Sequence, residues 1–112
     1  MNGRSKTPKD AHRFIRAVAK QHGWVVNPDD EFVDHLAGGL AQNYNNYGYF
    51  LCPCRDGDGE RPVDRDIICP CEYVVPDQKE YGHCMCGLFL SKEFSATGNE
   101  PQSIPERRPG GI

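Results

Sequence analysis

The spacing of its six cysteines constrains this chain more than any other feature of the sequence. They form three Cys-X-Cys pairs, separated by 14 and 12 residues: Cys52-Pro53-Cys54, Cys69-Pro70-Cys71 and Cys84-Met85-Cys86. A central proline fixes φ and removes an N–H, so two of the pairs are predicted to sit in stiff, extended turns. The two sulfurs of such a pair point in different directions. One pair can therefore place one sulfur on a metal site and the other beside it.

The remaining sequence predicts a small domain with a thin core. The chain has 112 residues, of which 38% are apolar, with 12 glycines and 9 prolines. That length is enough for one domain. With so few apolar residues, the fold would gain stability from a disulfide or a bound metal. We expect an N-terminal tail at residues 1–6, one domain at 7–97 and a flexible C-terminal tail at 98–112.

Two amphipathic helices are predicted before the cysteines. Thr7 and Pro8 have the residue types of a helix N-cap and first position, and Gly23 fits a stop, which predicts a helix over about 8–22. The start signal recurs at Pro28, and the apolar spacing that follows predicts a second helix over about 28–45. The Gly38-Gly39 pair inside it would allow another backbone to pack closely.

Charge and hydropathy argue against two classes of partner. The net charge is −3, and no long basic run provides a footprint for nucleic acid. No stretch approaches the roughly 20 apolar residues of a membrane helix. The first ten residues lack the apolar core of a secretion signal, so we expect a cytoplasmic protein.

Three kinds of site compete for six cysteines in a reducing compartment. Structural zinc takes four ligands, usually from Cys-X-X-Cys pairs, which fits three Cys-X-Cys pairs poorly. A framework of three disulfides needs an oxidising compartment. A 4Fe–4S cluster takes four thiolates, which leaves two cysteines for one dithiol/disulfide couple. A non-enzymatic module in which zinc or a cluster only staples the fold remains the alternative to a redox enzyme.

Three stretches of the sequence resemble one protein family. They are YGYFLCPCR at 47–55, IICPC at 67–71 and CMCGLFL at 84–90. Together they resemble the catalytic (beta) chain of ferredoxin:thioredoxin reductase, and the resemblance extends from about Pro8 to Gly98. It implies a mainly α, small single domain of short helices and loops wrapped around a 4Fe–4S cluster.

The resemblance also implies a role for each cysteine. The cluster ligands would be Cys52, Cys69, Cys71 and Cys84, while Cys54 and Cys86 would form the redox-active disulfide. The implied enzyme is a disulfide reductase that takes single electrons from ferredoxin and reduces thioredoxin or a thioredoxin-like protein. Cys54 would be the accessible nucleophile with a lowered pKa, Cys86 would face the cluster, and the ligands would be buried. A small variable subunit is a further implied partner.

Two departures from the plant-type members stand out. Met85 occupies the place of a histidine that serves proton transfer in the family, and the 12-residue gap before the third pair is longer. Both features point to a bacterial or archaeal branch. His83, just before Cys84, is the candidate replacement proton donor. Arg55 follows the predicted nucleophile, where it would stabilise the Cys54 thiolate, meet an acidic partner or remain solvated.

Overall fold

Two capped helices form the N-terminal half of the molecule, which the computed structural model describes over residues 5–55 and 57–107. Helix α1 spans Pro8–His22. The Thr7 side chain accepts a hydrogen bond from the Asp10 N–H, and the Asp10 carboxylate accepts one from the Thr7 N–H at 3.0 Å. This capping box satisfies two backbone donors that the first turn leaves unpaired. The helix ends at Gly23, whose φ of 73° is easily reached only without a side chain. The predicted helix over 8–22 is confirmed.

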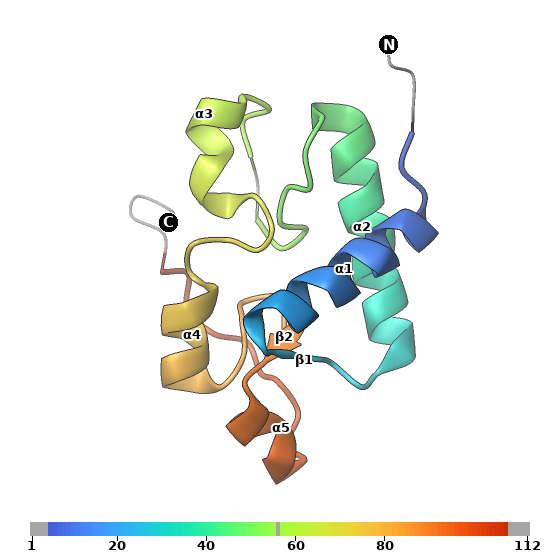
Figure 1. Ribbon diagram of the computed structural model, residues 1–112. Coiled ribbons are helices and arrows are strands. Elements are labelled where there is room, and N and C mark those ends of the chain that lie inside the picture. Colours follow the sequence, from blue (N-terminus) through green and yellow to red (C-terminus); the bar gives the residue numbers. More distant parts are fainter. Residues whose placement is uncertain (1–4, 56, 108–112) are drawn as a thin grey trace.

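Helix α2, Asp30–Tyr47, packs across α1 (Figure 1). Asp29 caps its first turn through the Phe32 N–H, and Gly48 ends it with a φ of 89°. The prediction of about 28–45 was therefore two residues too early at both ends. Pro28 lies outside the helix because Asp29 supplies the N-cap. The C-terminal end continues through Asn46 and Tyr47, because the residue that can adopt the left-handed conformation there is Gly48.

The second half is built of short elements joined by loops. Within the described residues it contains α3 (Arg61–Asp64), the 3₁₀ turn η1 (Arg65–Ile67), α4 (Val74–Tyr81), β2 (Phe89–Leu90) and α5 (Lys92–Thr97). Strand β2 pairs antiparallel with β1 (Val25–Val26), which follows α1. This pairing connects the end of the cysteine region to the corner between α1 and α2 (Figure 1).

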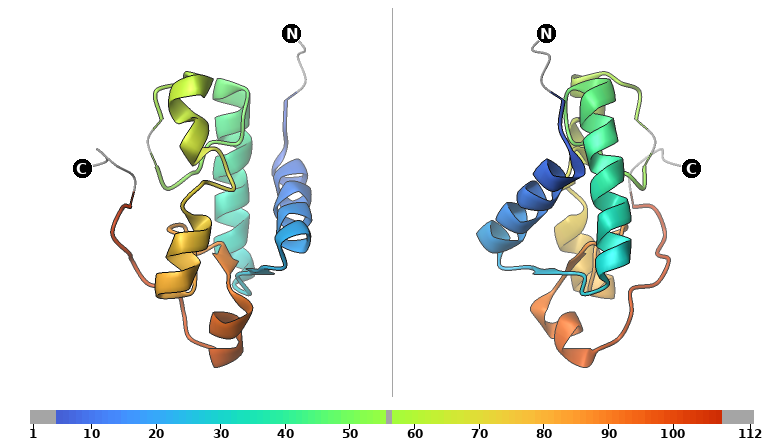
Figure 2. Two further views of the ribbon diagram at one scale, coloured as in Figure 1. Left: turned by 60° about the vertical axis from the view of Figure 1, so that its left-hand side comes forward. Right: turned by 90° about the vertical axis from the view of Figure 1, so that its right-hand side faces the viewer.

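The molecule is compact, mainly α and a single small domain, as predicted. In the left view of Figure 2, α2 lies between α1 and the α3–α4 region. The largest core cluster joins the inner faces of α1 and α2 to Cys52, Cys71, Cys84 and Cys86. The cysteines are thus part of the hydrophobic core. In the described residues no helix is both long and apolar enough to cross a bilayer.

The C-terminal segment runs back along the side of α4 (Figure 2). The Gln102 N–H donates to Nε2 of His83 at 3.2 Å, and Arg107 binds the carboxylates of Asp77 and Glu80. The division into a tail, a domain and a second tail stays a prediction. Residues 1–4 of the first tail and 108–112 of the second lie outside the described residues.

Candidate active site

Backbone hydrogen bonds bring the first two cysteine pairs side by side. Leu51 and Ile68 form an isolated antiparallel bridge. Beside it the Cys52 N–H donates to the Ile67 carbonyl at 2.9 Å, and the Cys69 N–H donates to the Phe50 carbonyl at 2.7 Å. These bonds fix the first residue of each pair, so the two turns are held in a fixed position relative to each other.

The third pair is held by β2 and by a side chain from the other half of the chain. The Cys84 N–H donates to the Phe89 carbonyl at 3.1 Å, and the Gly87 N–H donates to the Cys84 carbonyl at 2.9 Å, which closes a tight turn. The buried amide of Asn27 donates to the Gly87 carbonyl at 2.8 Å. This turn therefore stays next to the first two pairs, although it lies more than ten residues further along the chain.

Helix α2 supports the first pair by backbone contact. A Cβ atom placed on Gly39 would lie 3.1 Å from Cβ of Pro53, tighter than ordinary van der Waals contact. At Gly38 a Cβ would meet nothing within 4 Å. The close approach that the Gly-Gly pair suggested therefore occurs at the second glycine.

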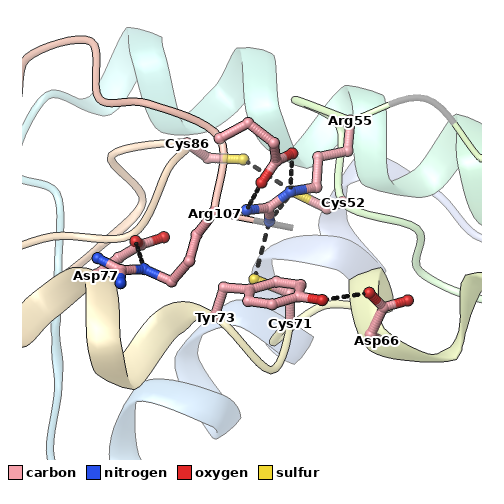
Figure 3. Close-up of polar contacts among 9 residues, drawn as sticks. Cys52, Arg55, Asp66, Cys71, Tyr73, Asp77, Cys86 and Arg107 are labelled. Atoms are coloured by element: carbon pink, nitrogen blue, oxygen red, sulfur yellow. Dashed lines mark hydrogen bonds and ion pairs between the residues drawn. The ribbon is translucent and has the colours of Figure 1, made fainter. Parts of the chain in front are cut away.

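The six thiols divide between two spaces. Cys52, Cys69, Cys71, Cys84 and Cys86 line one cavity, together with Pro53, Met85 and apolar side chains of α4 and the β2 region. Sγ of Cys86 lies 3.2 Å from Sγ of Cys52 (Figure 3). Cys54 instead lines a surface hollow of about 600 Å³ with Phe32, Gly38 and Gly39 of α2. It is the one exposed cysteine of the six, and all six are free thiols.

The acidity of the thiols follows the same division. Hydrogen bonds with the thiols of Cys52 and Cys86 lower the pKa of Cys54 to about 4. The hydrogen bond to Cys54 raises the pKa of Cys52 to about 11, and burial raises the pKa of Cys84 to about 11. The contact with Cys52 also raises the pKa of Cys86. The exposed thiol is therefore the one that ionises readily, as a nucleophile requires.

Arg55 lines the cysteine cavity and is buried. Its Nη1 donates to Sγ of Cys71 at 3.0 Å (Figure 3), and its guanidinium lies over the ring of Tyr73, with 5.1 Å between Cζ and the ring centroid. Its Nε and Nη2 bind the carboxylate of Glu106. The interpretation of Arg55 as solvated is wrong, because the side chain is buried and its contacts with sulfur are a hydrogen bond to Cys71 and a longer contact to Cys52.

His83 points away from the cysteine cavity. Its Nδ1 donates to the Cys84 carbonyl at 2.7 Å, because a carbonyl can only accept, and its Nε2 accepts the Gln102 N–H. These two bonds specify the neutral ring with its proton on Nδ1. The ring also packs edge-on against Phe94. The predicted proton donor is thus near Cys84 in sequence but contacts its backbone, not its sulfur.

The lining of the cavity fits an iron–sulfur cluster. The four predicted ligands, Cys52, Cys69, Cys71 and Cys84, all contribute to one cavity whose other walls are largely apolar. Four cysteine sulfurs are the donor set that a 4Fe–4S cluster takes. Among the described residues, no group of three or more ligating side chains is arranged to hold a single metal ion.

Sequence reasoning missed the contribution of the C-terminal segment. Glu106 stands in a Pro-rich stretch with no periodicity, so nothing in the pattern indicated that it would reach Arg55, 51 residues away. Tyr73, two residues after Cys71, was equally unmarked. The position of Arg55 directly after Cys54 was the one local signal for this network.

Comparison with known proteins gives a single family. The family model for the ferredoxin thioredoxin reductase catalytic beta chain matches residues 2–107. The catalytic chain of ferredoxin-thioredoxin reductase from Cyanidium caldarium is 32% identical over 93 residues, covering 80% of this chain and 84% of the relative. The chloroplastic catalytic chain from Arabidopsis thaliana is 30% identical over 97 residues, with 85% and 64% covered. The Synechocystis catalytic chain is 29% identical over 103 residues, with 90% and 83% covered.

The match extends over both halves of the fold and all three cysteine pairs. It agrees with the resemblance seen in the sequence and with the division of the thiols between a buried cavity and an exposed hollow. The chain belongs to the ferredoxin-thioredoxin reductase catalytic beta chain family.

Proposed function

We propose that this chain is a disulfide reductase that uses electrons from ferredoxin to reduce thioredoxin or a thioredoxin-like protein. The observation that carries the proposal is the arrangement of two neighbouring thiols. Cys54 is exposed and readily ionised, whereas Cys86 beside it lines the buried cysteine cavity. One thiol can thus meet a protein substrate while the other stays with the electron source.

The chemistry of the two thiols balances for one turnover. The Cys54 thiolate attacks the substrate disulfide, forms a mixed disulfide and releases one substrate thiolate. Cys86 then attacks Sγ of Cys54, forms the Cys54–Cys86 disulfide and releases the second thiolate. Two electrons have then passed to the substrate, and its two thiolates take up two protons, one that Cys86 gives up and one from solvent. Two single electrons from ferredoxin, with two protons, restore the dithiol.

The cofactor that we propose is a 4Fe–4S cluster held by Cys52, Cys69, Cys71 and Cys84. When bound, it supplies one-electron storage, which lets single electrons open a disulfide. The chain's own residues exclude water from it, because Cys52, Cys71 and Cys84 are buried and Leu88 and Phe89 complete the wall. Low solvent exposure is one determinant of a cluster's potential.

The proposed partners are ferredoxin as donor, a thioredoxin-fold protein as substrate and a small variable subunit as a candidate third protein. The hollow of about 600 Å³ beside Cys54 is where the substrate disulfide would approach. The proposed location is the cytoplasm, a reducing compartment in which cysteines bind metal or carry out redox chemistry more often than they form structural disulfides. Assignment to a bacterial or archaeal branch stays a prediction.

His83 is kept as the proposed proton donor. Its ring would have to exchange one of its two hydrogen bonds to reach a sulfur. A His83→Gln variant that changes the pH profile of kcat would support the role. An unchanged profile with lower thermal stability would leave His83 as a residue that joins the third cysteine pair to the C-terminal segment.

The first test is anaerobic purification with analysis of iron and sulfide. About four of each per chain are expected. Ferredoxin-dependent reduction of thioredoxin should then be measured in Cys54→Ser and Cys86→Ser. We expect both variants to keep their iron and to lose turnover. Cys86→Ser should accumulate a mixed disulfide with thioredoxin, because no second thiol is left to resolve it.

Two results would contradict the proposal. A Cys54→Ser protein that reduces thioredoxin at the wild-type rate would remove the nucleophile from the scheme. A protein that takes up one zinc and no iron, even after attempted cluster reconstitution, would favour the non-enzymatic metal-binding module.

A further inference from the structure

The C-terminal segment places a carboxylate against the one cation of the cysteine cavity. Arg55 is the charged residue among the described residues that line this cavity, and its side chain is 2% exposed. A buried guanidinium is costly unless an anion and hydrogen-bond acceptors satisfy it. Glu106 supplies the anion, with Oε2 at 2.7 Å from Nε and Oε1 at 2.8 Å from Nη2.

The geometry of this pair determines where the remaining donors point. A carboxylate bound by Nε and Nη2 occupies one edge of the planar fork and fixes its orientation. Nη1 is then directed to the opposite side, where Sγ of Cys71 lies at 3.0 Å. The ring of Tyr73 covers the guanidinium, and the Tyr73 hydroxyl donates to Asp66. The fork is therefore held at its edge and its face.

Arg55 remains charged in this environment. A guanidinium is not deprotonated in proteins, and the Glu106 carboxylate pairs with it at 2.7 and 2.8 Å. A hydrogen bond from a charged donor stabilises the thiolate form of a cysteine more than a neutral donor does. Cys71 is one of the four proposed cluster ligands, so this donor acts on the cluster site.

A second contact anchors the same segment without touching a sulfur. Arg107, the residue after Glu106, binds Asp77 through Nε at 2.8 Å (Figure 3) and also binds Glu80. Asp77 and Glu80 belong to α4. Arg107 therefore docks the segment on α4, while Glu106 contacts Arg55. The two adjacent residues can be substituted separately.

We propose that Glu106 is a positioning residue for the cluster site: it holds the Arg55 fork so that Nη1 donates to Sγ of the proposed ligand Cys71. This inference rests on the proposed function, because it gives a role to a cluster that the proposal places there. The segment thereby contributes to the electron-storing site from outside the three cysteine pairs. Outer partners of metal ligands typically change metal affinity or activity by about 10- to 100-fold when they are removed.

The test measures loss of iron to a chelator from the anaerobic holoprotein. In Glu106→Gln the amide binds the fork less firmly, Nη1 leaves Sγ, and iron loss should be about 10-fold faster than in the wild type. Arg107→Gln is the matched control, since it weakens docking of the same segment. Its rate should stay within about twofold of the wild type, because the hydrogen bonds of Arg107 go to α4 and not to the Arg55 fork or to a sulfur. Arg55→Lys keeps the charge, lacks the fork and should match Glu106→Gln.

A combined variant tests whether Glu106 acts through Arg55. Adding Glu106→Gln to Arg55→Lys should produce no further acceleration, because the bond between the two side chains has already been lost. Equal acceleration in Arg107→Gln would overturn the proposal in favour of general docking, and so would additive effects in the double variant. If Arg55→Lys does not fold, the rates of iron loss from Glu106→Gln and Arg107→Gln still distinguish positioning of Arg55 from general docking of the segment.

The reduction potential of the cluster separates positioning from simple charge removal. Loss of the donor to Cys71 destabilises the reduced, more negative cluster, so Glu106→Gln should shift the potential to a more negative value. Removal of a nearby negative charge with Arg55 still in place would shift it to a more positive value. A positive shift overturns the proposal. If no iron is bound at all, it is the proposed function that fails.

Discussion

The helix pair and the cysteine loops are stabilised by contacts of different range. In α1 and α2, the caps join residues three apart, Thr7 with Asp10 and Asp29 with Phe32. In the cysteine half, Asn27 reaches Gly87 across 60 residues. The buried Asp64 accepts from Tyr49, 15 residues away, and from two backbone N–H groups five and six residues before it.

This difference indicates how each half gains its order. Local capping and an apolar stripe allow a helix to form before the rest of the chain has folded. Loops that depend on distant partners become ordered only when the whole set has assembled, and a bound cofactor contributes its binding free energy to that step. We therefore expect the two halves to respond differently to the same perturbation, and the following experiments test that expectation.

Iron removal should show the largest difference between the halves. After anaerobic chelation, hydrogen exchange at the amides of Cys52 and Cys69 should accelerate by at least about 100-fold, because cluster binding stabilises the folded loops. Amides within α1 and α2 should change far less. Exchange measured residue by residue by NMR would check this. Equal acceleration in both halves would show that they unfold as one unit.

Substitution of Asp64 should disturb the loop before α3. Its carboxylate accepts from the Tyr49 hydroxyl at 2.6 Å and from the backbone N–H groups of Asp58 and Gly59 at 3.0 Å each. Burial and this bond raise the pKa of Tyr49 to about 12, so the phenol remains a donor at neutral pH. Asp64→Ala leaves buried donors unpaired, and we expect a loss of about 2 kcal/mol in urea unfolding.

The control for Asp64 is an acidic residue of α2. Asp34 has a 69% exposed side chain and pairs with His12 on the surface of the helix pair. Asp34→Ala should cost less than about 0.5 kcal/mol. A similar loss in both variants would mean that burial does not distinguish the two carboxylates.

Alkylation should separate the exposed thiol from the buried ones. In reduced, iron-free protein at pH 6, Cys54 is almost fully ionised because its pKa is lowered to about 4. A low pKa also reduces nucleophilicity, so we expect a net preference over Cys86 of at least about 10-fold. The rate at Cys54 should stay nearly constant from pH 8 to 6 and fall as the pH approaches 4.

A second variant checks the cause of this pH dependence. Cys86→Ala removes one of the hydrogen bonds that lower the pKa of Cys54. In this variant, the labelling of Cys54 should therefore decline at a higher pH than in the wild type. Peptide mapping by mass spectrometry measures both proteins. A labelling curve that is identical with and without Cys86 would assign the low pKa to another cause.

Removal of a local cap should have the smallest effect. Thr7→Ala takes away the side-chain acceptor at the start of α1. It should lower the free energy of unfolding, measured by thermal denaturation, by about 1 kcal/mol and leave the cysteine loops unchanged. The Thr7 N–H lowers the pKa of Asp10 below 3.8. The stability contributed by the hydrogen bond from the Thr7 N–H to the Asp10 carboxylate is therefore present above pH 3.8. It is lost as the pH falls through the lowered pKa of Asp10. Loss of iron in Thr7→Ala would contradict the separation of the halves.

The same difference explains what could be predicted from the sequence. The helix over 8–22 was predicted with its ends because the cap residues and the stop glycine lie next to the apolar stripe they bound. The family was identified because three cysteine pairs with their flanking residues make a specific pattern. Both signals are local in the chain, so no fold was needed to read them.

Long-range partners could not be predicted in this way. Nothing near Glu106 indicated Arg55, and nothing near Asn27 indicated Gly87. His83 was predicted to act on sulfur because it precedes Cys84. The structure shows its ring turned to backbone groups, since adjacency in sequence does not determine side-chain direction. The roles assigned to individual cysteines remain predictions from family resemblance.

The two adjacent glycines of α2 should have had different evolutionary histories. Gly38 faces open space, where a side chain would meet nothing within 4 Å. At Gly39 a methyl group would press on Pro53, the residue between the proposed ligand and the proposed nucleophile. Packing leaves position 38 open to substitution, but a side chain there would enter the hollow beside Cys54, so we expect small residues at that position. At position 39 even a methyl group requires Pro53 to shift by a few tenths of an ångström, so we expect glycine there more often than at position 38.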